Sequence, residues 1–145
     1  MNRLNKFLVA AFMAAAIVLP NIVQAMEIWQ FDKMAVSDQS EYVGLLVQGA
    51  EKVLTDEGRS DLAAQVEDLF TTTDPGDRHT IGAVEFEMNL ALAREADAKN
   101  VLKNPNSPRI EVEDAMAVTL KKNHIDLPDS FFTVASNFKP KFPPK

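Results

Sequence analysis

Cysteine is absent from this chain of 145 residues. No disulfide can therefore stabilise the fold, and no thiol can act as a nucleophile, a metal ligand or a lipid-attachment site. A chain of this length can bury enough apolar surface to fold without such links. The absence of cysteine indicates a domain that is held together by side-chain packing alone.

Glycine, histidine and the polar aromatic residues are also scarce. The five glycines are spread along the chain and form no phosphate-binding loop, and Trp29 and Tyr42 are the single residues of their types. The two histidines, His79 and His124, are too far apart in sequence for a local metal motif. We therefore expect no cofactor and no enzyme activity. One alternative stays open: a small hydrolase using an acidic pair, because 21 acidic residues offer many pairs.

Basic residues are outnumbered by acidic ones, and the formal net charge is −6. An acidic chain is repelled by polyanions, and no stripe of basic residues interleaved with aromatics is present. Nucleic acid is therefore not an expected partner.

The first 25 residues have the three regions of an export signal. Arg3 and Lys6 precede an apolar run over 7–19, and Val23-Gln24-Ala25 presents small residues where a signal peptidase cleaves. The run of 13 residues is shorter than the roughly 20 that cross a membrane. We expect cleavage after Ala25, a periplasmic or secreted protein, and no membrane span after cleavage. The alternative is a cytoplasmic protein whose translation starts at Met26.

Apolar residues recur at helical spacing through most of the mature chain, with no alternation of period two. This pattern predicts an all-α fold: a compact bundle of four to five helices with short capped loops. The predicted helices span 39–57, 61–70, 81–103, 108–123 and 131–137, and a short helix near 28–34 docks on them. The expected organisation is one helical domain over 26–138 and an extended, proline-rich basic tail over 139–145.

Polar residues at the expected helix ends suggest where each helix begins. The spacing of Asp38 and Glu41 resembles a capping box, and Ser60, Thr80 and Ser107 are suited to accept bonds from the first free N–H groups. Gly58 suits the left-handed residue that ends the first long helix. The helix over 81–103 has so broad an apolar face that we expect it in the middle of the bundle.

The segment DPGDRHTIGAVEFE, residues 74–87, resembles the calcium loop of an EF-hand in outline. With Asp74 first, Thr80 falls at the seventh position, Ile81 at the apolar eighth and Glu85 at the last, where a loop of about twelve residues has ligands or a hydrophobic contact. The resemblance implies a calcium site at Asp74, Thr80 and Glu85.

The intervening ligand positions depart from that pattern. Gly76 has no side-chain oxygen, Arg78 brings a positive charge, and His79 stands where the turn calls for glycine. The favoured interpretation is therefore a turn between two helices with no metal site, and a degenerate EF-hand-like calcium-binding protein is the alternative.

Phenylalanine and lysine gather at the C-terminal end. The candidate partner-binding residues are Phe131, Phe132, Phe138, Lys139, Lys141 and Phe142. The alternative is that the first three rings pack on the bundle and the tail frays. A groove is the second candidate, with apolar residues spread around the helices: Tyr42, Leu45, Met88, Leu92 and Met116. The resulting hypothesis is a small, acidic, exported, non-enzymatic binding protein whose partner is another exported protein or a small apolar ligand.

Overall fold

The computed structural model describes residues 26–71 and 80–137. Its helices are α2 (Ile28–Asp32), α3 (Val36–Asp56), α4 (Ser60–Phe70), α5 (Ile81–Lys103), α6 (Val112–Lys122) and α7 (Asp129–Ala135). Within these two ranges there is no strand, and one isolated bridge joins Glu27 to Glu111. The all-α prediction is confirmed, and each expected helix has a counterpart.

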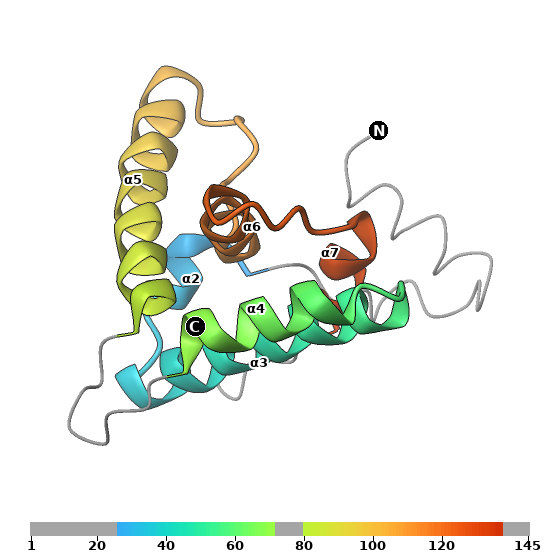
Figure 1. Ribbon diagram of the computed structural model, residues 1–145. Coiled ribbons are helices and arrows are strands. Elements are labelled where there is room, and N and C mark those ends of the chain that lie inside the picture. Colours follow the sequence, from blue (N-terminus) through green and yellow to red (C-terminus); the bar gives the residue numbers. More distant parts are fainter. Residues whose placement is uncertain (1–25, 72–79, 138–145) are drawn as a thin grey trace.

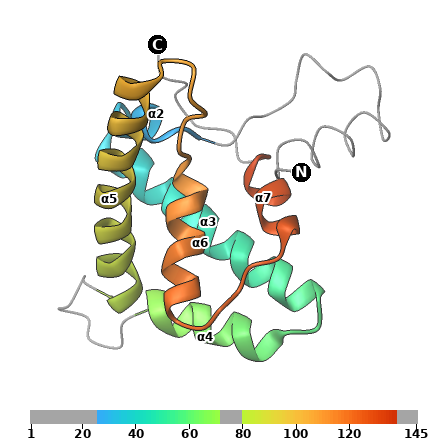
Figure 2. The ribbon, with the colours of Figure 1, turned by 90° about the horizontal axis from the view of Figure 1, so that it is seen from above.

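Two helical pairs make up most of the structure. α3 and α4 run side by side as a hairpin, and α5 packs against α6 as a second pair that crosses the first (Figures 1 and 2). The N-terminal end of α5 meets the C-terminal end of α4, while α2 contacts α5 and α7 contacts α3. The core lies where the two pairs meet, and its largest buried side chains include Phe31, Leu46, Phe86, Leu90, Met116 and Phe131.

The position of α5 differs from the prediction. Phe86 and Leu90 are buried in the core, but Met88 and Leu92 are 62% and 59% exposed on another face. α5 therefore lies at an edge of the bundle, and the breadth of its apolar pattern reflects an exposed row as well as a buried one. An apolar pattern alone does not distinguish these cases, because both have helical spacing.

The start of α3 also differs. The helix begins at Val36, three residues before the predicted start, and the backbone N–H groups of Asp38 and Gln39 both donate to the carbonyl of Ala35 at 2.9 Å. Asp38 thus lies inside the first turn and does not cap it. The Gln39 side chain instead donates to the carbonyl of Phe31 at 2.9 Å, which links α3 to the preceding short helix.

α6 begins at Val112, four residues later than predicted. Residues 108–111 are not helical, and Glu111 caps α6 in a capping box with Asp114, so Ser107 and Pro108 do not begin it. The reason is tertiary. Buried Asp97 accepts three bonds from the Arg109 guanidinium and a fourth from the Ile110 N–H, which holds this segment extended against α5.

Two glycines permit the sharp connections. Gly58 has φ of +76°, as its predicted role after α3 requires, so that α4 can turn back along α3. At Gly82, an added Cβ would lie 2.7 Å from the Leu69 carbonyl oxygen and 2.9 Å from ring carbons of Phe70. Only glycine allows the first turn of α5 to approach the end of α4 this closely.

Candidate functional site

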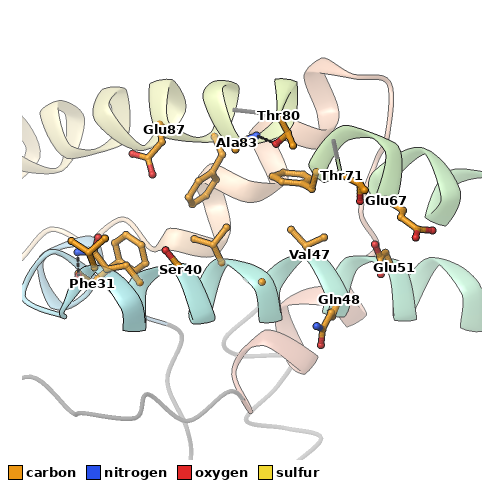
Figure 3. A pocket seen from close by; sticks show the side chains of 16 residues that line it. Phe31, Ser40, Val47, Gln48, Glu51, Glu67, Thr71, Thr80, Ala83 and Glu87 are labelled. Carbon is orange, nitrogen blue, oxygen red and sulfur yellow. Dashed lines mark hydrogen bonds between the residues drawn. The ribbon is translucent and has the colours of Figure 1, made fainter. Parts of the chain in front are cut away.

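A groove of about 690 Å³ opens between α3, the end of α4 and the start of α5 (Figure 3). One face of α3 forms its length, because Gln39, Ser40, Val43, Val47 and Glu51 recur at helical spacing along it. α5 runs above this face and contributes Thr80, Ala83, Phe86 and Glu87 (Figure 3). The volume lies within the range of small-molecule sites, about 300–1,000 Å³.

Apolar side chains line part of the groove, and polar side chains line a comparable part. Phe31 and Phe86 are each 1% exposed and present little surface to the groove, while Val43, Val47 and Phe70 are half-buried along its wall. Gly44 lies among them, and a Cβ placed on it would meet nothing within 4 Å. The missing side chain at Gly44 therefore leaves open space between α3 and the opposite wall.

The rim of the groove carries negative charge. Glu51 on α3, Glu67 on α4 and Glu87 on α5 line it, and among its described lining residues there is no lysine, arginine or histidine. Glu51 and Glu67 extend from neighbouring helices at the same end of the groove (Figure 3). Partial burial, together with the charge of Glu67, raises the pKa of the Glu51 carboxyl. A positive group placed here would relieve that repulsion.

A separate polar cluster lies inside the core, where α3 meets α6. The Glu113 side chain is fully buried, and its Oε1 accepts a hydrogen bond from the Tyr42 hydroxyl and one of 3.4 Å from the Met26 backbone nitrogen. Its other oxygen, Oε2, is buried with no hydrogen-bond partner among the described residues. Burial raises the pKa of Glu113 to about 7, although the Tyr42 hydrogen bond opposes the shift. Burial, reinforced by Glu113, also raises the pKa of Tyr42.

The structure places part of the proposed calcium loop in other roles. The Thr80 hydroxyl accepts a bond of 3.1 Å from the Ala83 N–H and so caps α5, as predicted. The Glu85 carboxylate accepts a bond of 2.6 Å from the Asn123 side chain. Asp74 lies outside the described residues, as do Gly76, Arg78 and His79. Within 26–71 and 80–137, no three acidic or histidine side chains are grouped as metal ligands would be.

The candidate partner residues fall in different places. Phe131 is fully buried in the core, and the half-buried Phe132 meets it edge to face with ring centroids 5.2 Å apart. Phe138, Lys139, Lys141 and Phe142 lie outside the described residues. The described part of this cluster thus belongs mainly to packing between α7 and α3.

The groove found in the structure is not the one suggested by the sequence. Of the apolar residues first considered, Tyr42 and Met116 are buried, and Met88 and Leu92 are exposed but do not line the groove. The sequence signal that was missed is a mixed face of α3, on which the small Gly44 and polar residues alternate with valines. Such a face resembles a solvated helix surface until its neighbours are known.

No helix in the described ranges is both long and apolar enough to cross a membrane. Comparison with protein-family models, curated proteins and solved structures finds no match to this chain.

Proposed function

We propose that this protein is an exported, non-enzymatic binding protein that holds a small, mainly apolar, positively charged molecule in the groove between α3, α4 and α5. The observation that carries the proposal is the combination of a partly apolar wall with an entirely acidic set of charged lining residues, Glu51, Glu67 and Glu87. Ligand sites of this size are mostly apolar, with a few polar groups that fix orientation.

The charge of the ligand follows from the rim. Three carboxylates around a partly desolvated groove disfavour an anionic ligand, and the pKa of Glu51 is raised first by partial burial and then by the charge of Glu67. A cation relieves this repulsion, whereas a neutral apolar molecule gains only from burial of its surface. An aromatic or aliphatic amine combines both contributions.

Two dyes of similar size and opposite charge provide the test. Fluorescence titration with acridine orange, an aromatic cation, is expected to show binding, and anilinonaphthalene sulfonate, an aromatic anion, is expected to bind at least about tenfold more weakly. The double change Glu51→Gln and Glu67→Gln is expected to remove most of this preference. The matched control, Glu57→Gln with Glu95→Gln, changes the same charge at exposed positions away from the groove.

The location is tested with Gly44→Leu. This substitution extends a side chain into open space and replaces glycine inside a helix, so the fold is expected to tolerate it. Loss of cation binding in a folded Gly44→Leu protein places the ligand in the groove. Unchanged binding of the cation in this variant would exclude the groove as its site.

A protein partner is a second candidate, favoured by the exposed apolar row on α5. Ile81 is 67% exposed, and Val84, Met88 and Leu92 continue the row at helical spacing. Such spacing matches the anchors by which an amphipathic helix of another exported protein would lie along α5. Replacing Met88 and Leu92 by lysine is expected to abolish capture of that partner while leaving dye binding intact. If the variant with lysine at both positions still captured the partner and lost only dye binding, this candidate would be contradicted.

A further inference from the structure

The Met26 nitrogen occupies an unusual place for the residue that follows an expected cleavage site. Met26 is 5% exposed, and its carbonyl accepts a bond of 2.9 Å from the Val112 N–H. The Ile28 N–H donates to the Ile110 carbonyl at 3.2 Å. These bonds pair 26–28 with 110–112 and hold the Met26 nitrogen over the first turn of α6, 3.4 Å from Oε1 of Glu113.

Glu113 lacks what a buried carboxylate needs. The other described residues donate to it from one hydroxyl and one backbone nitrogen, both to Oε1, and Oε2 accepts no hydrogen bond among them. The neighbouring acid, Glu111, adds repulsion. A buried charge without a counter-ion is strongly disfavoured. As an amide, the Met26 nitrogen offers one donor and no charge, whereas an α-ammonium offers three donors and a positive charge.

We propose that cleavage between Ala25 and Met26 creates a buried ion pair, in which the new α-ammonium group of Met26 is the counter-ion of Glu113. The step is hydrolysis of one peptide bond and consumes one water. The C–N bond breaks, the Ala25 carbonyl carbon gains an oxygen and becomes a carboxylate, and the Met26 nitrogen becomes an ammonium. The ammonium can then donate to Oε2 as well as Oε1, and this ion pair holds the mature N-terminus in the core. This inference rests on the export signal included in the proposed function.

The first measurement is the N-terminus of the protein purified after expression of the full chain with its leader. Intact mass is expected to show Met26 as the first residue, with an unmodified amine. Reductive methylation of the folded protein is followed by fragment-ion mass spectrometry of peptide 26–59, because trypsin no longer cuts after methylated lysine and the next arginine is Arg59. It is expected to modify the α-amine at least about tenfold more slowly than in the unfolded protein, because a paired buried amine reacts only through opening. Modification at the unfolded rate would overturn the ion pair.

The second measurement uses thermal unfolding to test coupling between the two groups. A Gly-Ser insertion between Ala25 and Met26 leaves two residues on the mature chain and turns the Met26 nitrogen into an amide. This insertion is expected to lower the unfolding midpoint by about 5 °C or more in the wild type, and by much less in Glu113→Gln. Glu57→Gln, an exposed change of equal charge, is expected to retain the full effect of the insertion. If the insertion lowered the unfolding midpoint equally in the wild type and in Glu113→Gln, the ion pair would be refuted. If Glu113→Gln does not fold, the methylation rate provides the test.

The possible negative results distinguish a failure of the export prediction from a failure of the ion-pair proposal. A mature chain that still begins at Met1 would overturn both export and the ion pair. Cleavage at another bond would overturn the ion pair and leave export standing. A product beginning at Met26 that persists in Met1→Leu would show translation from Met26, which removes export but retains a free α-amine beside Glu113. Binding of acridine orange in the groove depends on none of these results.

Discussion

The hydroxyl of Tyr42 on α3 donates a hydrogen bond to the carboxyl of Glu113 on α6, 71 residues away in sequence and fully inside the core. This contact ties the two helical pairs together through a polar bond where the surrounding side chains are apolar. Because both groups are buried, removal of either partner deprives the other of a hydrogen bond that compensates for part of its lost hydration.

Tyr42 is the single tyrosine, so its ionisation can be followed directly by ultraviolet absorbance. Burial and Glu113 raise its pKa above the ordinary value of 10.0. The folded protein is therefore expected to retain the phenolic proton at pH 10 to 11, and stability is expected to fall as pH rises above 10, where the unfolded chain loses that proton. Titration of tyrosine near pH 10 while circular dichroism still reports the native fold would contradict this placement.

In the protein that carries the Gly-Ser insertion before Met26, Glu113 is expected to make the free energy of unfolding depend on pH in the acidic to neutral range. Its pKa is raised from 4.5 to about 7, so the native state holds a proton that the unfolded state releases between these values. The free energy of unfolding is expected to decrease by up to about 3 kcal/mol as pH rises through this window. Tyr42 and Glu111 are the other titratable groups acting on Glu113.

Chemical denaturation at several pH values measures this decrease. Glu113→Gln removes the titrating group, and its decrease should be absent. In the mature protein that begins at Met26, the proposed ammonium favours the ionised carboxylate, and the decrease should be smaller. A decrease of equal size in all three proteins would assign it to other groups.

Gly82 and Gly44 form a matched pair for a stability measurement. Gly82→Ala forces a Cβ to within 2.7 Å of the Leu69 carbonyl oxygen, whereas Gly44→Ala meets nothing within 4 Å. We expect Gly82→Ala to destabilise by about 1–3 kcal/mol, as overpacking does. Gly44→Ala should stabilise by up to about 1 kcal/mol through helix propensity. Urea unfolding of both variants provides the comparison, and similar values for the two would disprove the close approach of α4 and α5.

Thr80 and Ser60 make a second pair. Thr80 caps α5 through its hydroxyl, while Ser60 is the first residue of α4, after the N-cap Arg59. Thr80→Ala is expected to cost about 1 kcal/mol, and Ser60→Ala should change the free energy of unfolding by less than about 0.5 kcal/mol. Equilibrium unfolding in urea again gives both values. A larger loss at Ser60 than at Thr80 would reverse this assignment of caps.

Helix positions were predictable wherever local signals decided them. α5 begins after Thr80 and ends at Lys103 as predicted, because its cap, its apolar spacing and the prolines beyond it all act within a few residues. α6 was misplaced because the backbone groups of Ile110 and Val112 bond to Asp97 and Met26, which are distant in sequence. No local signal at Ser107 or Pro108 reports those partners.

The sequence by itself determined the helical class, the ends of α5 and the acidity of the chain, since composition and local spacing govern these properties. Only the tertiary structure decided which faces are covered. Phe131 is buried and Met88 is exposed, although both are apolar residues on helices. The tertiary structure also placed Glu51 beside Glu67 and the Met26 nitrogen beside Glu113. These juxtapositions depend on how separate helices pack, and the groove and the buried carboxylate exist only as a result of that packing.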